Sequence, residues 1–326
     1  MLSCKKREYS RQAGRKQWYN QSLMQLPQIT KILTDSDLDG IVSGAMLRIV
    51  FPDAQIIIGD PTGMQLGRYD DAVNGGTVIA DLAYVEGCGM YFDHHESNRP
   101  EHSDFAGSWQ PAPSAAEVVY NFFRNDFDLS AFSPLIPEVS KLDSALFTLA
   151  EYRQPSEVMR LGLVISRDDR AFNHLLIELL AVRSWDFVWQ HELVQQKLVR
   201  AQEAADRIAD YIHSNLKIHD GIGVIDMQNF AEDVRTSSFE FTSLYPDLDA
   251  LMVFKPEREG FKVTFYSNSF NDDAFDYNLL AVAEEMNPAS SGGHRGACGF
   301  VPRPGQTKTV VLIRRSLCWQ SSVENN

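Results

Sequence analysis

Short apolar runs alternate with longer helical patterns along the chain, beginning at about residue 29. The first half contains four such runs, each bounded by polar or glycine positions, as buried strands usually are. Because strands alternate with helices, the pattern favours an α/β fold built on a largely parallel sheet. The expected strands are Ile29–Thr34, Ile56–Ile58, Val78–Ala80 and Met90–Phe92, and the expected helices include Ile41–Val50 and Ser114–Phe123.

A long amphipathic helix is predicted between two regions of different pattern. From His191 to His213, apolar residues recur at steps of three or four, which places them on one helix face. Short strands return after Asp220, at Ile222–Asp226, Leu251–Phe254, Lys262–Tyr266 and Thr309–Ile313, with a helix around Tyr277–Glu285. The expected organisation is a basic, disordered extension (1–28), a first domain (29–190), a linking helix (191–218), a second α/β domain (219–316) and a tail (317–326).

Charge and composition narrow the classes of partner and compartment. The 326 residues carry a formal net charge of −14, so the molecule repels long polyanions such as duplex DNA. The basic extension has an excess of five positive charges, which is more typical of a solvated segment than of a nucleic-acid arm. Four scattered cysteines without C-x-x-C spacing favour neither a zinc site nor disulfides, and they suit a cytoplasmic location. No apolar run is long enough for a membrane span or a secretory signal.

Three aspartates crowd the turn that follows the first expected strand. They lie in the run Asp35-Ser-Asp37-Leu-Asp39-Gly40. Carboxylates at this spacing repel one another unless cations neutralise them, and such oxygen ligands suit Mn²⁺ or Mg²⁺. Gly40 permits a tight turn into the next helix. From these residues alone, an acidic surface loop or a helix N-cap is the alternative interpretation.

Further candidate ligands follow later strands. Asp81 and the triplet Asp93-His94-His95 each come directly after an expected strand. Open α/β sheets bind ligands outside the carboxyl ends of their strands, so these side chains are expected near one crevice. Neutral imidazole is a ligand for Mn, Fe, Co or Zn, and neighbouring side chains on extended backbone point to opposite sides. One histidine would therefore ligate a metal while the other contacts substrate or supports a ligand from behind. A turn aspartate and a surface histidine pair are the alternatives.

Two more motifs lie farther along the chain. Asp143, within Lys-Leu-Asp-Ser-Ala, has a helical setting and adds one carboxylate. The run Ser291-Gly-Gly-His-Arg-Gly-Ala forms a glycine-rich loop that carries His294 and Arg295. Glycines let backbone N–H groups approach phosphate oxygens, and a helix beginning there would add a favourable dipole. An ordinary glycine turn is the alternative.

In their joint order these segments resemble the DHH phosphoesterases. The resemblance covers about residues 29–302 and implies a parallel-sheet DHH domain, a linking helix, a smaller α/β DHH-associated domain, and an active site in the cleft between the two domains. Asp35 stands where many members have histidine, as in the branch of the RecJ-type exonucleases. In the second domain, Ser291 replaces a glycine and Tyr266 begins a segment without the arginine often found there. The matching segments are TDSDLDG at 34–40, IADL at 79–82, DHHES at 93–97, KLDSA at 141–145 and SGGHRGACGF at 291–300.

The resemblance also implies a centre of two Mn²⁺ ions, with Mg²⁺ or Co²⁺ as alternatives, that activates water for phosphoester hydrolysis. One ion is expected at Asp35, Asp37 and Asp81, and the other at Asp39, Asp81, His94 and Asp143. The expected catalytic residues are His95 and Asp93. Substrate is expected to contact His95, Gly292, Gly293, His294 and Arg295.

The expected activity is hydrolysis of short oligonucleotides or small nucleotide phosphates, as by an oligoribonuclease. A compact substrate needs only metals and a few local donors in so acidic a protein. An exopolyphosphatase or pyrophosphatase is one alternative, although few lysines and arginines lie near the motifs. A metal- and nucleotide-binding regulatory protein without turnover is another. The expected partner is a small nucleotide or short single-stranded oligonucleotide, with no duplex DNA and no membrane, and a homodimer is left open.

Overall fold

The chain forms two compact units. The computed structural model describes residues 26–102, 104–230, 237–257, 260–275 and 277–303. Met1–Ser144 and Ile165–Val188 make up the first unit, and Ala145–Val164 and Trp189–Asn326 make up the second. The segment Ala145–Val164 thus packs with the second unit, although the sequence placed it before the boundary at residue 190. Where the domains begin and end otherwise stays a prediction.

A five-stranded, wholly parallel sheet forms the centre of the first unit, in the order β2-β1-β3-β4-β5. The four strands predicted from apolar runs are present, each within two residues of its expected bounds. The fifth strand was not predicted, because its three residues contain no aliphatic side chain. The strands are β1 (Lys31–Thr34), β2 (Gln55–Ile58), β3 (Thr77–Ala80), β4 (Met90–Asp93) and β5 (Gly107–Trp109).

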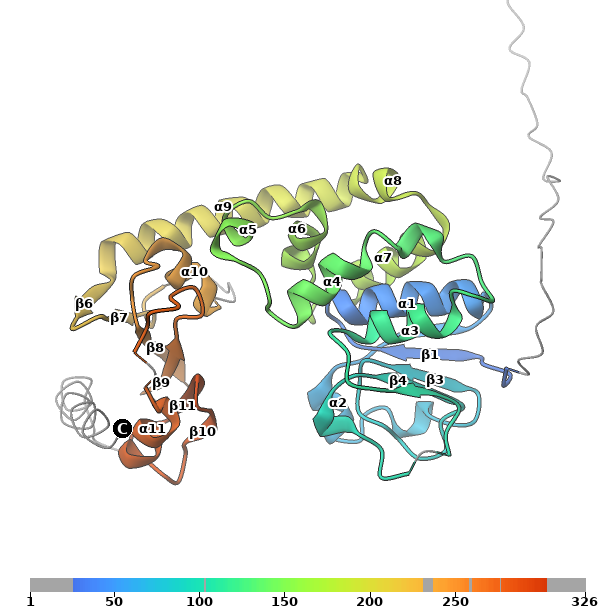
Figure 1. Cartoon of the computed structure of the whole chain (residues 1–326), viewed down its shortest axis with the longest axis horizontal. Coiled ribbons are helices and arrows are strands. Elements are labelled where there is room, and N and C mark those ends of the chain that lie inside the picture. The colour runs from blue at the N-terminus through green and yellow to red at the C-terminus, as the bar shows by residue number, and fades with distance from the viewer. Residues whose placement is uncertain (1–25, 103, 231–236, 258–259, 276, 304–326) are drawn as a thin grey trace, which may run out of the picture. The chain divides into compact units, whose positions relative to one another are not determined.

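Helices α1, α3 and α7 pack against one face of this sheet (Figure 1). The opposite face carries a smaller hydrophobic cluster in which Leu33, Ile79 and Tyr91 lie side by side on neighbouring strands. Alternate strand residues therefore serve the two faces, and both are buried, as parallel sheets require. The remaining elements of this unit are α1 (Leu38–Val50), α2 (Pro61–Gln65), η1 (Asp70–Ala72), η2 (Glu96–Asn98), α3 (Ala115–Phe123), η3 (Ser130–Phe132), α4 (Ile136–Asp143) and α7 (Arg170–Val182). The short helix α8 (Trp185–Trp189) contains the point where the chain passes to the second unit.

The second unit contains a mixed six-stranded sheet in the order β10-β11-β9-β8-β7-β6, in which only β7 and β8 pair in parallel among the described strands. The predicted long helix is present as α9 (Glu192–Asn215). The strands are β6 (Lys217–His219), β7 (Ile222–Asp226), β8 (Ala250–Glu257), β9 (Gly260–Ser267), β10 (Gly292–His294) and β11 (Ala297–Phe300). The other helices are α5 (Leu149–Arg153), α6 (Glu157–Val164), α10 (Ser238–Leu244) and α11 (Leu279–Met286).

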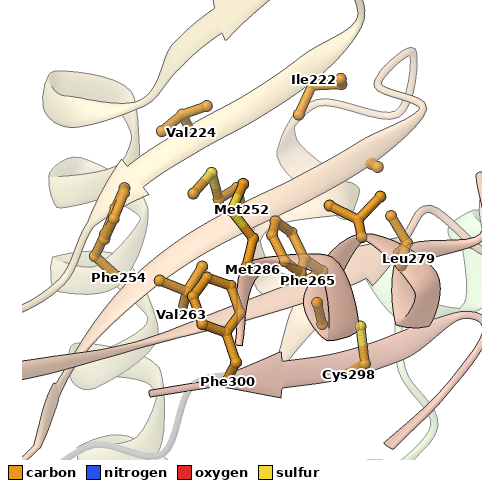
Figure 2. Packing of buried hydrophobic residues seen from close by; sticks show 13 residues of the cluster. Ile222, Val224, Met252, Phe254, Val263, Phe265, Leu279, Met286, Cys298 and Phe300 are labelled. Atoms are coloured by element: carbon orange, nitrogen blue, oxygen red, sulfur yellow. The ribbon is translucent and has the colours of Figure 1, made fainter. Parts of the chain in front are cut away.

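Both faces of the second sheet are packed. Helix α11 covers one face, where Met252, Phe265 and Phe300 meet Leu279 and Met286 (Figure 2). Residues of α9 and α10 cover the other face. The predicted strand Thr309–Ile313, the tail and nearly all of the basic extension lie outside the described residues. Within the described part of the chain, no helix combines the length and apolarity that crossing a bilayer requires.

Candidate metal centre

The acidic motifs of the first unit meet at one edge of its parallel sheet. Asp35 follows β1, Asp81 follows β3 and Asp93 ends β4. Because these strands are adjacent and parallel, their carboxyl ends lie side by side. The sequence motifs are therefore brought together by the order of the strands.

The first motif folds as a tight turn in which glycine is required. A Cβ on Gly40 would lie 2.4 Å from the carbonyl oxygen of Asp35, a clash with backbone. The Thr34 hydroxyl closes the turn by donating to the Gly40 carbonyl at 2.6 Å. Asp37 is the N-cap of α1, since its side chain accepts from the Gly40 N–H at 3.0 Å. The capping alternative thus holds for Asp37, which leaves its second carboxylate oxygen available.

Asp35, Asp37 and Asp81 form one acidic group, in which an oxygen of each lies within 4.8 Å of the others. Asp35 is buried and accepts hydrogen bonds from Ser36. Burial and the neighbouring charge of Asp37 raise the pKa of Asp35 to about 6. These three are the residues expected to hold one metal.

Asp81 is the most constrained member of this group. Its φ of +58° lies in the left-handed region, which non-glycine residues adopt at a cost of about 1 kcal/mol or more. The side chain is buried, yet neither carboxylate oxygen has a hydrogen-bond partner among the described residues. Burial, followed by the charges of Asp39 and Asp37, raises its pKa well above the usual range. A cation at this position would offset the cost of the strained backbone and of the two unpaired oxygens.

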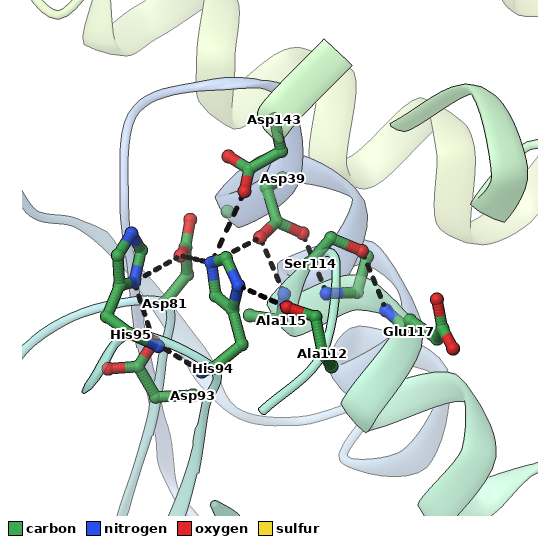
Figure 3. Close-up of polar contacts among 12 residues, drawn as sticks. Asp39, Asp81, Asp93, His94, His95, Ala112, Ser114, Ala115, Glu117 and Asp143 are labelled. Carbon is green, nitrogen blue, oxygen red and sulfur yellow. Dashed lines mark hydrogen bonds and ion pairs between the residues drawn. The ribbon is translucent and has the colours of Figure 1, made fainter. Parts of the chain in front are cut away.

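A second group contains Asp39, His94 and Asp143, whose ligand atoms also lie within 4.8 Å of one another (Figure 3). Asp39 is fixed by the start of α3, because its two oxygens accept from the Ala115 and Ala116 N–H groups at 2.7 Å each. Burial and the charge of Asp143 nevertheless raise the pKa of Asp39 well above its usual range. Asp143, the last residue of α4, brings the third ligand atom.

His94 faces these carboxylates with one ring nitrogen. Its Nδ1 lies 2.9 Å from the Ala112 carbonyl, an acceptor, so Nδ1 donates there and Nε2 is the nitrogen that faces the carboxylates. Nε2 is buried and has no hydrogen-bond partner in the described part of the chain; it lies 3.3 Å from Asp143 Oδ2 and 3.8 Å from both Asp39 Oδ2 and Asp81 Oδ1. This is the arrangement of a metal-ligating histidine with its supporting carbonyl.

His95 and Asp93 form a hydrogen-bonded pair beside the two groups. His95 Nδ1 lies 2.9 Å from Asp93 Oδ1, and this bond raises the pKa of His95. Asp93 is buried and also accepts from Tyr91 and Asn98 at 2.8 Å each. Although burial raises the pKa of Asp93, these hydrogen bonds lower it overall. With all its oxygens hydrogen-bonded, Asp93 fixes the orientation of His95, whose side chain is 45% exposed.

The donor set fits divalent cations. Five carboxylates, most of them buried or half-buried, converge here with one imidazole nitrogen. Burial, followed by the charges of neighbouring carboxylates, raises the pKa values of four of these carboxylates. Hard oxygen donors with one imidazole suit Mn²⁺ or Mg²⁺. The structure thus brings together the six residues named as ligands, Asp35, Asp37, Asp39, Asp81, His94 and Asp143. Their assignment to particular ions stays a prediction.

The glycine-rich segment of the second unit forms a hairpin of β10 and β11, so no helix begins there. Gly293 has a φ of +123°, and a Cβ at this position would lie 2.4 Å from the Ala297 carbonyl oxygen. Arg295 is at the exposed turn between the strands. The expected phosphate contacts of Gly292, Gly293, His294 and Arg295 stay a prediction, and the side chain of His294 lies outside the described positions.

The supporting residues of the centre were not identified from sequence. Ala112 orients His94, the start of α3 holds Asp39, and Tyr91 and Asn98 hold Asp93. Ser114, the first residue of the predicted helix, is the N-cap of α3, because its hydroxyl accepts from the Glu117 N–H. Backbone carbonyls and amides carry no signature in sequence.

Solved structures with a similar fold are known. A pGpG-specific phosphodiesterase from Vibrio cholerae superposes with a TM-score of 0.74 at 21% identity, over 89% of this chain and 98% of that one. The DHH domain of a protein assigned to a ribosomal protein family superposes at 0.58, with 13% identity over 90% and 87% of the two chains. This chain has the DHH phosphoesterase fold. The resemblance in sequence had predicted that fold, and it is confirmed.

A third solved structure with a similar fold contains a metal ion. RecJ from Thermus thermophilus, in a structure with Mn²⁺, superposes with a TM-score of 0.54 at 13% identity, over 89% of this chain and 52% of RecJ. No protein-family model matches the chain, and no curated protein matches it in sequence. At these identities the likeness concerns the fold.

Proposed function

We propose that this protein is a phosphoesterase of the DHH family that uses two Mn²⁺ ions to hydrolyse short oligonucleotides or small nucleotide phosphates. The observation that carries the proposal is Asp81, a buried and strained aspartate whose two unpaired oxygens lie within reach of two ligand groups. Asp35 and Asp37 would hold one ion with Asp81, and Asp39, His94 and Asp143 would hold the other. The fold shared with a pGpG-specific phosphodiesterase and with a DHH domain supports phosphoesterase activity.

When bound, the ions would supply Lewis-acid activation of water and of the phosphoryl group. The protein would contribute the remaining steps. Asp93 holds His95 in one orientation and favours its protonated form, so the free Nε2–H would donate to a phosphoryl oxygen. Ala112 keeps the lone pair of His94 directed at the ligand group. The backbone amides of α3 prevent Asp39 from turning away.

The net charge of the chain and one solved structure with this fold support the proposed substrate class. A net charge of −14 disfavours a long polyanion, whereas a dinucleotide requires few positive contacts. One relative with the same fold is specific for pGpG. The protein is expected to act in the cytoplasm.

A substrate panel tests the proposal. Purified protein with Mn²⁺ is incubated with linear dinucleotides, cyclic dinucleotides, adenosine 3′,5′-bisphosphate, inorganic polyphosphate and single-stranded DNA, and products are separated by chromatography. We expect the linear dinucleotides to be cleaved fastest and His94→Ala to abolish both cleavage and full Mn²⁺ binding. Preferred cleavage of polyphosphate would replace the substrate class, and metal binding without turnover of any compound would indicate a regulatory protein.

A further inference from the structure

Trp109, the last residue of the unpredicted strand β5, lies beside the sheet edge that carries the candidate metal centre. It pairs in register with Asp93 of β4. Its indole Nε1–H donates to the backbone carbonyl of His95 at 3.0 Å. Since the His95 ring lies 3.7 Å from Asp81 Oδ1, one residue separates the indole from the candidate metal centre. All of these residues belong to the first unit.

The indole is held in place by its neighbours, and the guanidinium of Arg99 lies over its ring. Trp109 packs against the hydrophobic cluster that contains Leu33 and Tyr91, while the residue itself remains partly exposed. The guanidinium carbon of Arg99 lies 4.9 Å from the centre of the indole ring. The ring is therefore fixed by the core and by its hydrogen bond, and the arginine rests on it.

Among the described residues, Arg99 makes no strong ion pair that would explain its position. Its side chain is 62% exposed, and the contact with Glu96 is 3.4 Å long to a side chain that is 73% exposed. An exposed pair of this kind contributes little to stability. A planar cation on an aromatic ring next to a cluster of carboxylates is instead suited to a ligand that brings both negative charge and a π face.

We propose that Trp109 and Arg99 form a stacking surface for a nucleobase of the substrate, next to the scissile phosphate. The inference rests on the proposed function and adds the recognition of a base to it. Unpaired bases stack on aromatic rings and on guanidinium planes, and every base offers such a face. The surface would select nucleotides over phosphoesters that lack a base.

Kinetics with paired substrates tests this surface. A purine dinucleotide is compared with two analogues, each lacking one of the two bases. For Trp109→Ala and Arg99→Ala we expect KM for the dinucleotide to rise about tenfold, within the range of losses seen when stacking residues are removed. The kcat value should change little in Arg99→Ala, whereas Trp109→Ala also removes the hydrogen bond to the His95 carbonyl and should lower kcat as well. KM for one abasic analogue should hardly change, because that substrate has already lost the contact. Equal KM changes for all three substrates, or none, would overturn the proposal.

Two further variants separate stacking from charge. Arg99→Lys keeps the charge but loses the plane, so it should behave like Arg99→Ala; full activity of Arg99→Lys would overturn a stacking role for this residue. Arg124→Ala removes another exposed arginine that rests on an aromatic ring, Tyr120, and serves as the matched control with unchanged KM.

A binding measurement keeps the test independent of turnover. With Mn²⁺ omitted, the dinucleotide should quench tryptophan fluorescence in the wild type, and Trp109→Phe should lose that quenching while the other four tryptophans remain. Undiminished quenching in Trp109→Phe would contradict the proposal. If the wild type hydrolyses neither the dinucleotide nor the analogues but shows the quenching, the proposed function fails while the stacking surface stands.

Discussion

Asp81 concentrates the chemistry of the candidate centre in one residue. A left-handed backbone, full burial and two carboxylate oxygens without partners among the described residues all raise the free energy of the metal-free protein. Such a residue persists when something else compensates its cost, and a cation between the two ligand groups would do so. The same reasoning does not apply to Asp93, whose oxygens are fully hydrogen-bonded.

Replacing Asp81 should reveal that cost. Asparagine tolerates the left-handed region, so Asp81→Asn removes the charge without new backbone strain. We expect the metal-free variant at pH 7.5 to be more stable than the wild type by about 1 kcal/mol, the lower end for an unsatisfied buried group. Mn²⁺ should stabilise the wild type but not the variant. Thermal unfolding with EDTA or with Mn²⁺ measures both effects.

The exposed Asp53, in the turn after α1, supplies the control for this comparison. Asp53→Asn should leave both the metal-free stability and the stabilisation by Mn²⁺ unchanged, since surface substitutions usually change stability by less than about 0.5 kcal/mol. A metal-free Asp81→Asn variant that is much less stable than the wild type would contradict the assignment.

Short elements position the centre because their ends, not their middles, carry the functional groups. The turn from β1 to α1 presents Asp35, Asp37 and Asp39, and the first turn of α3 holds Asp39 through two backbone amides. The amides at a helix N-terminus favour a negative side chain, so α3 binds Asp39 as it would bind an anion.

Gly40 is the residue on which the first turn depends. In Gly40→Ala, the new Cβ would lie 2.4 Å from the Asp35 carbonyl oxygen, so the turn must shift. We expect a loss of stability of about 1–3 kcal/mol and a loss of Mn²⁺ binding, because the three aspartates move with the turn. Chemical denaturation and metal titration measure these losses.

Gly75 offers a matched alanine substitution. A Cβ there has open space and the backbone is not left-handed, so Gly75→Ala should leave both stability and Mn²⁺ binding close to those of the wild type. If Gly40→Ala bound Mn²⁺ as well as Gly75→Ala does, the first turn would not be part of a metal site.

At the scale of the whole molecule, the carboxylates of the candidate centre affect how the stability of the protein depends on pH. The carboxylates of the centre are buried close together, and burial raises the pKa values of Asp35, Asp39, Asp81 and Asp143. In the metal-free protein, each of these groups favours folding in its protonated form.

The stability of the metal-free protein should therefore depend on pH in an unusual direction. The folded pKa of Asp35 is about 6 against 3.8 as the reference value, so its contribution is present at low pH and is lost as pH rises through 6. We expect the melting temperature in EDTA to fall as pH rises from about 5.5 to about 7.5. With saturating Mn²⁺ the trend should reverse, because the ions bind the ionised carboxylates.

Differential scanning calorimetry in both conditions provides the measurement. Asp81→Asn in EDTA should show a weaker fall with pH, since it removes one of the raised carboxylates. A melting temperature in EDTA that rises steadily over this pH range would contradict the buried, uncompensated carboxylate cluster.

The sequence alone predicted the strands that lead into the site, the long helix α9 and the order of the acidic motifs. These features follow from local physical rules: apolar runs bury as strands, a three-to-four-residue repeat forms one helix face, and carboxylates crowded at a turn need a counter-charge. It missed β5, since Gly107-Ser-Trp109 has no aliphatic pattern, and it left open a helix start at the glycine-rich segment, which is a hairpin.

Only the tertiary structure decided which groups meet. The parallel order of β1, β3 and β4 brings Asp35, Asp81 and His94 to one edge, although they are far apart in sequence. It also sets the backbone of Asp81, gives His94 its carbonyl partner, and places Trp109 against His95. The sequence identifies the candidate site residues because strand and helix propensities act over short distances along the chain. The contacts of those residues depend on strand order and on backbone groups, which carry no information about residue type.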